Sequence, residues 1–344
     1  MTKLIMKERI NYLDALRGFT MFLVVFGHVM LFSLDLGGYK SVIGSIFLTF
    51  RMPMFFFISG YIAYKSIDFW TFDFFKKRFA KKAQIQIIPA VLFFSLFCYL
   101  HGGNPLNVFK HGWQGYWFTF VLFEMFVFYY TLSLIGRNTS DKVVDVGLFI
   151  LSCLGILWLA LADRSPQIYQ ITCMENLTKY FQFFTFGVLS RKYNGSFKKL
   201  VSNDLFKAFV IVLFLVCIIL YFEDTVLPSV FFSFNHDILV RYLGVLLVFI
   251  FFYTKRSYFD QNNRFVSMSL FVGKRTLDIY LLHYFFLPDL MCFQEWLIPN
   301  ERMLMQLVVA GIVSCLVICI CLLVSEIIRT SNFLGHYLFG AKRV

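Results

Sequence analysis

The stretch LDALRGFTMFLVVFGHVMLF, residues 13–32, is apolar enough to enter a membrane but carries three ionisable side chains. Arg17 and His28 are eleven residues apart, which in an α-helix places them on one face, about 16 Å apart along the axis. Asp14 lies three residues before Arg17 and can neutralise it. Histidine is the natural general base near neutral pH, and guanidinium geometry suits a phosphate. The segment predicts a proton acceptor and an anion anchor at opposite ends of one polar stripe; the alternative is a structural Asp14–Arg17 pair and a His28 that donates to a carbonyl.

Other ionisable residues also lie in apolar segments, where each costs a few kcal/mol and is a functional candidate by default. Counted from the outer ends of their segments at about 1.5 Å per residue, four such residues fall in the outer half of the bilayer: His28, His283, Glu124 and Arg51. Clustered charges cost less than scattered ones, because pairing and cavity water relieve them. We therefore expect these four side chains to share a cavity.

Three polar residues near the C-terminal end of the chain are expected to have other roles. Asp278 is five residues before His283, on a different face of its helix, so no direct pair is expected. Thr276 is seven residues before His283 and shares its face. Glu326, near the inner end of the last apolar segment, is expected to be structural, beside Arg329.

This layout favours a group transfer in which His28, with Glu124 or His283, activates an acceptor hydroxyl. Arg17 is about 16 Å away and cannot act on the same carbonyl, but it can hold a phosphorylated donor with a long reactive arm, such as coenzyme A. Arg51 is expected to stabilise the oxyanion that develops during transfer. Further donor phosphate contacts are expected from three basic residues: Lys77, Arg78 and Lys82.

The composition requires that membrane helices position these residues. Of the 344 residues 59% are hydrophobic and only 15% are charged, whereas a soluble domain is about a quarter charged. The fold class is therefore all-α, because in hydrocarbon every backbone group must be paired within a helix. The net charge of +12 is attributed to basic cytoplasmic loops and not to nucleic-acid binding.

The apolar runs predict ten membrane-spanning segments in a single domain, residues 1–344, with no soluble extra domain. The segments are 11–32, 41–64, 83–100, 116–136, 143–161, 179–190, 205–222, 238–254, 268–287 and 303–328. The first one lacks a cleavage site and is expected to stay as a helix. Alternate connections hold 24 of the 32 Lys and Arg, beginning with Lys3, Lys7 and Arg9, so both termini are predicted to be cytoplasmic.

Stretch 69–82 and the cysteines each allow two interpretations. The aromatic and basic stretch 69–82 is interpreted as an interfacial helix on the inner leaflet, with a site for an anionic cytoplasmic ligand as the alternative. The eight cysteines show no metal-binding spacing, and no metal is expected. Cys173 and Cys292 fall in predicted outer loops, where a disulfide between them is an open alternative to two free thiols.

Several motifs resemble the acyltransferase-3 family of integral membrane acyltransferases. The family's signature resembles LDALRG together with the Arg17-to-His28 spacing. Its second helix resembles FRMPMFFFISGYI (50–62), and its aromatic fourth helix resembles YWFTFVLFEMFVFYY (116–130). YFQFFTFGVLSRK (180–192) and GKRTLDIYLLHYFF (273–286) are similar to its later Phe…Gly and Tyr-Leu-x-His blocks. The second-helix motif also resembles the fucose and polysaccharide O-acetylase branch.

The resemblance implies a ten-helix protein of the bacterial cytoplasmic membrane that moves an acyl group, usually acetyl, from cytoplasmic acyl-coenzyme A. The acceptor would be a hydroxyl of a cell-envelope glycan or its lipid-linked precursor, and acetyl-coenzyme A would be a co-substrate with no permanently bound cofactor. The carried-over residues are the essential pair Arg17 and His28, the helix-two residues Arg51, Ser59 and Gly60, and the late His283.

Two other function classes stay open. A transporter or flippase for a glycan or small anion would also place charges on several helices, but no inverted repeat is apparent. A structural membrane subunit would leave the alignment of Arg17 with His28 unexplained.

Overall fold

The computed structural model describes residues 10–36, 42–106, 114–161, 171–222, 230–298 and 302–340, and all regular elements within these ranges are helical. The predicted all-α class is confirmed. The first half contains α1 (Asn11–His28), α2 (Val42–Ala63), α3 (Phe72–Leu100), α4 (Trp117–Asn138), α5 (Asp141–Leu161) and α7 (Met174–Lys192). The second half contains α8 (Asn194–Ser202), α9 (Asp204–Phe222), α10 (Val230–Thr254), α11 (Arg264–Lys274), α12 (Thr276–Leu282), α13 (Gln294–Leu297), α14 (Met303–Arg329) and α15 (Asn332–Phe339).

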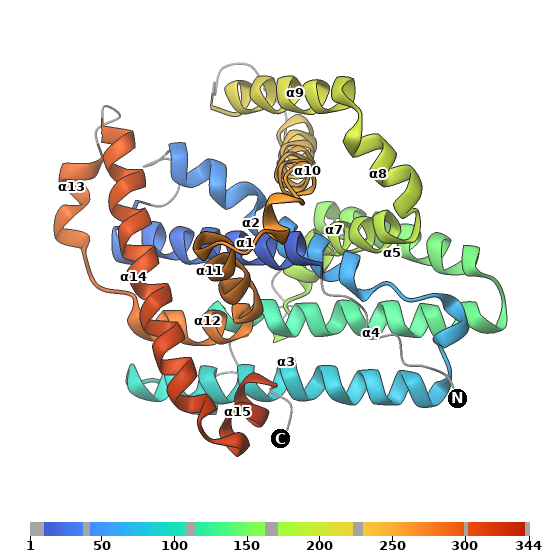
Figure 1. The fold of residues 1–344 in the computed structure, drawn as a ribbon, viewed down its shortest axis with the longest axis horizontal. Helices are drawn as coiled ribbons and strands as arrows, with labels where there is room; N and C mark the ends of the chain where they lie inside the picture. Colours follow the sequence, from blue (N-terminus) through green and yellow to red (C-terminus); the bar gives the residue numbers. More distant parts are fainter. Residues whose placement is uncertain are drawn as a thin grey trace.

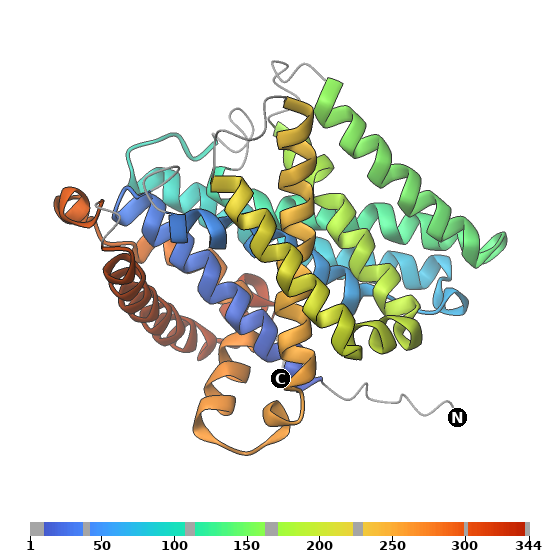
Figure 2. The ribbon, with the colours of Figure 1, turned by 90° about the horizontal axis from the view of Figure 1, so that it is seen from above.

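The long helices α3 and α4 run side by side, and α14 crosses this part of the bundle at one end and packs against α1 (Figure 1). Seen from above, α10 lies across the bundle with α9 packed against it (Figure 2). Helix α2 packs between α1 on one side and α7 and α10 on others. This arrangement surrounds the C-terminal half of α2 and the polar face of α1 with other helices.

Six helical segments in the described part of the chain are long and apolar enough to cross a membrane: Asn11–Ser33, Phe72–Leu100, Trp117–Asn138, Asp141–Leu159, Asp237–Thr254 and Met303–Arg329. A seventh is added if α8 and α9, which meet at 74°, form one bent span. Helices also form at the other predicted segments, as α2, α7 and the α11–α12 pair, but they are not among the six. Ten spans and cytoplasmic termini stay predictions, and Lys3, Lys7 and Arg9 lie outside the described residues.

Two predicted segments differ from the observed helices. Most of the basic stretch 69–82 is the first part of α3, which begins at Phe72 and runs unbroken to Leu100, and its place at the inner leaflet stays a prediction. The Thr71 hydroxyl accepts from the Phe74 amide and caps this start. The ninth segment, predicted as continuous over 268–287, divides at Arg275 into α11 and α12 and ends in a 3₁₀ turn over His283–Phe286.

Close backbone contacts decide which helices cross. A β-carbon on Gly60 of α2 would overlap the carbonyl oxygen of Phe184 in α7, and one on Gly187 of α7 would overlap the carbonyl oxygen of Phe57 in α2. Glycines at a helix crossing let two backbones approach closely. Gly60, which the sequence associates with the helix-two motif, therefore sets the distance between α2 and α7.

Two ion pairs join α14 to the helices beside it, and one of them gives Glu326 a structural role, as expected. Arg329 makes a two-pronged contact with the buried Asp278 of α12, with N···O distances of 2.8 and 2.9 Å. Glu326 pairs instead with Arg275, at 2.6 Å. Both contacts connect the end of α14 to the α11–α12 junction, so Asp278 is a structural residue facing away from His283.

Candidate active site

One face of α1 lines two adjoining cavities. Arg17 and Met21 border a cavity of about 310 Å³, and Met21, Val24 and His28 border a smaller one of about 60 Å³. These positions follow the i, i+4, i+7, i+11 spacing of one helical face, so the predicted polar stripe is confirmed. Residues that line both cavities show that the two are neighbours: Met21, Phe55, Phe118 and Tyr280.

The larger cavity is basic at one end. Arg17, Lys65, Arg78 and Lys82 all contribute to its wall. Its volume is at the lower end of the range of about 300–1,000 Å³ that ligand pockets occupy. Cations gathered around a partly apolar cavity suit a ligand with a phosphorylated head and an uncharged arm.

The predicted phosphate-binding residues divide according to the face of α3 that they occupy. Arg78 and Lys82 are four residues apart and line the cavity, whereas Lys77 is exposed and does not. The reason is geometric, because Lys77 is turned about 100° from Arg78 around the helix. The Lys82 ammonium lies 3.5 Å from the centre of the Phe126 ring, which holds it against the cavity wall.

Arg17 is held at the junction of α1 with α12. Its guanidinium donates to the Thr276 hydroxyl at 3.0 Å and lies 3.6 Å from the Asp14 carboxylate. The expected ion pair within α1 is confirmed, and it does not bury the arginine, whose side chain keeps 31% of its surface exposed. Arg17 can therefore meet an anion that enters the larger cavity.

Gln86 is a polar residue inside this cavity that the sequence analysis did not single out. It is buried, lines the wall near Lys82, and its Oε1 atom has no hydrogen-bond partner among the described residues. An unmet acceptor inside a cavity is costly unless a ligand or water supplies a donor. The available signal was a glutamine within an apolar run, QIQIIPA, over residues 84–90.

Ser59 also lines the larger cavity, on the side of α2. The resemblance assigns it to the helix-two motif, and its place on the wall is compatible with a role in ligand binding. The neighbouring Gly60 faces α7 instead, as described above. One motif therefore contributes both to the cavity and to helix packing.

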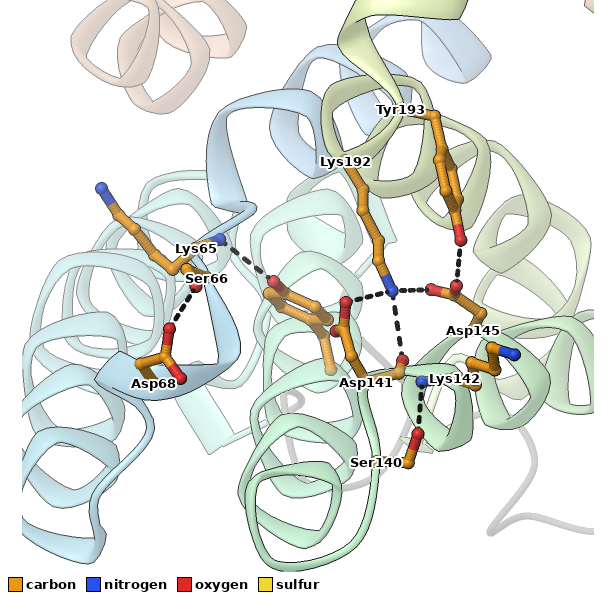
Figure 3. Close-up of polar contacts among 10 residues, drawn as sticks. Lys65, Ser66, Asp68, Ser140, Asp141, Lys142, Asp145, Lys192 and Tyr193 are labelled. Atoms are coloured by element: carbon orange, nitrogen blue, oxygen red, sulfur yellow. Dashed lines mark hydrogen bonds and ion pairs between the residues drawn. The ribbon is translucent and has the colours of Figure 1, made fainter.

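A polar cluster lies behind the basic end of the cavity. Lys192 at the end of α7 contacts Asp141 and Asp145 of α5 at 2.8 and 2.7 Å, and the Tyr193 hydroxyl donates to Asp145 (Figure 3). Beside this cluster, the Lys65 amide donates to the Tyr129 hydroxyl. The ion pairs of Lys192 join α7 to α5, and the Lys65–Tyr129 contact joins the segment after α2 to α4.

His28, which lines the smaller cavity, contacts His283, which is not among the residues that line it. The His28 Nδ1 and His283 Nε2 atoms are 2.7 Å apart, although the residues come from α1 and the turn after α12. The α-helix of α1 ends at His28 and continues as a π-helical turn, Val29–Ser33, a rare geometry that is frequent at functional sites. The predicted meeting of the two histidines is confirmed.

The hydrogen bonds decide which ring nitrogens carry protons. His283 Nδ1 faces two carbonyl oxygens, of Ile279 at 3.0 Å and Tyr280 at 2.8 Å, so it must donate. In the neutral ring its Nε2 is then an acceptor, and His28 Nδ1 donates to it. His28 Nε2 is left with the lone pair, which is the form that a general base requires.

Arg51 of α2 completes the smaller cavity. It is buried, lines the wall with His28, and donates through one terminal nitrogen to the Val24 carbonyl at 3.1 Å. Its Nε atom is buried with no hydrogen-bond partner among the described residues. A desolvated guanidinium with an unused donor is suited to stabilise an oxyanion.

Glu124 does not join the other three residues of the predicted cluster. It is absent from the walls of both cavities. Phe118, Leu122 and Phe126 of α4 face the larger cavity at four-residue intervals, and Glu124 is turned about 200° from Leu122 around the helix. No disulfide joins Cys173 to Cys292, the other pair left open.

Comparison with known proteins identifies one family. Residues 10–326 match the acyltransferase-3 family, described as an acyltransferase domain. The chain belongs to the acyltransferase-3 family. No curated protein and no solved structure matches it. Together with its apolar helices, membership identifies the chain as a multi-pass membrane protein and supports acyltransferase activity.

The basic wall of the larger cavity leads to a test by substitution. If the donor is an acyl-coenzyme A, Lys82→Met is expected to raise its KM about tenfold, because a charge-assisted hydrogen bond contributes about 1.5–3 kcal/mol and each 1.4 kcal/mol is a factor of ten. Lys77→Met on the exposed face of α3 is the matched control and is expected to leave KM unchanged. Initial rates over a range of donor concentrations measure both. Equal effects of the two substitutions would contradict the assignment.

Proposed function

We propose that this protein transfers an acyl group, acetyl in the simplest case, from cytoplasmic acyl-coenzyme A to a hydroxyl of a cell-envelope glycan or lipid-linked sugar. The observation that carries the proposal is the junction of a basic cavity with a smaller one that holds His28 beside Arg51. The first suits a phosphorylated donor, and the second suits acyl transfer. The acceptor class and the bacterial cytoplasmic membrane location rest on the resemblance of the helix-two motif to polysaccharide O-acetylases.

The donor binds with its phosphates near Arg17, Lys65, Arg78 and Lys82. Gln86 accepts a hydrogen bond from an amide N–H of the pantetheine arm, which satisfies its unpaired oxygen. The arm extends past Met21 and Phe55, which line both cavities. The thioester carbonyl then lies near Arg51, which contacts α1 at Val24, about two helical turns from Arg17.

The acceptor hydroxyl attacks the thioester carbon as its proton moves toward His28 Nε2. Arg51 stabilises the negative charge on the carbonyl oxygen, and His283 accepts from His28 Nδ1 and so stabilises the imidazolium that forms. The carbon–sulfur bond then breaks, and the imidazolium proton neutralises the thiolate of coenzyme A. His283 is a positioning residue in this scheme, and His28 is the general base.

Turnover of labelled acetyl-coenzyme A by the protein in proteoliposomes tests the proposal. Wild-type protein is expected to release coenzyme A and to label a crude envelope glycan, and Arg17→Ala is expected to lose at least about 90% of this activity, because the donor loses a charge-assisted contact worth about 1.5–3 kcal/mol. Absence of thioester turnover by wild-type protein, with glycan present, would contradict the proposal and favour a transporter. Full activity of Arg17→Ala would contradict the assigned donor site alone.

A further inference from the structure

Tyr284 is the residue in direct contact with the free nitrogen of His28. Its hydroxyl lies 3.2 Å from His28 Nε2, and it lines the smaller cavity together with Arg51. The position of the ring is defined by its surroundings, since it packs against Tyr116 and His283 with ring centres 5.5 and 4.2 Å away. A β-carbon at Gly115 would lie 2.7 Å from the Tyr284 hydroxyl oxygen, so glycine at that position leaves room for the hydroxyl.

The direction of this hydrogen bond follows from the proton positions on the two histidines. His283 Nδ1 donates to backbone carbonyls, His28 Nδ1 donates to His283, and His28 Nε2 carries the lone pair. Tyr284 must therefore donate to His28 Nε2. A neutral imidazole nitrogen has one lone pair, so an acceptor hydroxyl cannot bind Nε2 while Tyr284 occupies it.

The tyrosine oxygen can accept a hydrogen bond while its own proton is donated to His28. We propose that Tyr284 is a further catalytic residue, which passes the proton from the acceptor hydroxyl to His28. The inference rests on the proposed function, and it assigns a role that the family motif does not specify.

The step is balanced in atoms and charge. As the acceptor oxygen bonds to the thioester carbon, its proton moves to the Tyr284 oxygen and the Tyr284 proton moves to His28 Nε2. Tyrosine ends the step neutral and His28 becomes an imidazolium. The same two transfers in reverse deliver the proton to the thiolate sulfur as the carbon–sulfur bond breaks.

Tyr284→Phe tests the relay, because it removes one oxygen and keeps the ring that packs on Tyr116. We expect kcat for acyl transfer to fall about 100-fold or more, which is the scale of a lost proton-transfer group, with little change in KM for the acyl-coenzyme A donor. Tyr116→Phe is the matched control. It removes a buried hydroxyl that donates to the Leu281 carbonyl in the same aromatic cluster but does not contact His28, and it is expected to keep kcat within about threefold of wild type, below the scale of a lost proton-transfer group.

A Tyr284→Phe protein that transfers acyl groups at the wild-type rate or faster would overturn the inference, since His28 would then accept the proton directly. His28→Ala distinguishes an error in the Tyr284 relay from an error in the role of His28. If His28→Ala is inactive while Tyr284→Phe is active, only the relay is wrong. An active His28→Ala contradicts the role of His28 as general base, and a wild-type protein that transfers no acyl group contradicts the proposed function itself.

The wild-type protein offers a second test that requires no variant. The rate of a single round of acyl transfer is measured in mixtures of light and heavy water. Two protons in motion predict a curved dependence of rate on deuterium fraction, because each transfer contributes its own isotope effect. A linear dependence corresponds to one moving proton and would overturn the relay.

Discussion

His28→Ala is expected to lower the rate of acyl transfer by about 100- to 10,000-fold, the range for loss of a general base. The physical reason is that His28 Nε2 carries the lone pair that takes up the proton, while the other ring nitrogen of His28 donates to His283. Under the proposed function the KM for acyl-coenzyme A is expected to change little, since its phosphates would bind near Arg17, at the other end of α1. Single-turnover transfer from labelled acetyl-coenzyme A measures the effect.

His336→Ala is the control for this substitution. His336 of α15 contacts Gln84 at 2.7 Å and lines neither cavity, so its loss is expected to leave the rate unchanged. His283→Ala is expected to reduce the rate less than His28→Ala, because it removes the group that orients the base. The double variant is expected to be no slower than His28→Ala, since residues that act as one unit are not additive. Independent, multiplying effects would contradict a coupled pair.

Gly187→Ala is expected to destabilise the protein by about 1–3 kcal/mol or more, as overpacking of a close contact does. The added β-carbon would overlap the Phe57 carbonyl oxygen, which belongs to a helix backbone and cannot move aside alone. Helix α2 would have to move away from α7, and α2 carries Arg51 and Ser59. We therefore expect a lower unfolding temperature in detergent together with reduced acyl transfer.

Gly311→Ala is the matched control for the glycine contact. Gly311 also lies in the middle of a helix, but no atom is within 4 Å of a β-carbon built there. Alanine has a higher helix propensity than glycine, so this variant is expected to unfold at the same temperature as wild type or higher. Equal destabilisation by both substitutions would show that the α2–α7 contact is not the cause.

Patterns along the chain were sufficient to predict the class of the protein and the polar face of its first helix. Apolar runs predict membrane helices because the bilayer leaves the backbone no other partners. The alignment of Arg17 with His28 follows from the helical repeat alone, and the structure confirms it. Both features are local, so they need no knowledge of neighbouring helices.

Residues on different helices were harder to assign, because their meeting depends on how each helix is rotated and on its depth in the bundle. Depth estimates placed His283 and Arg51 near His28 correctly, but they also included Glu124, which α4 turns away from the cavity walls. The same rotation on α3 separates Arg78 and Lys82 from Lys77.

Only the tertiary structure shows which side chains contact the predicted site residues. The break at Arg275 lets α12 end in a turn that points His283 at His28, and a continuous helix over 268–287 would not have predicted that turn. Tyr284 is assigned a role because its hydroxyl faces the lone pair of His28. Gln86 is assigned one because it faces the larger cavity. The physical reason is that helical periodicity predicts only which residues of one helix share a face. Hydrogen bonds across the site depend on how the helices pack, for example where Gly60 and Gly187 each lie against the backbone of the opposing helix.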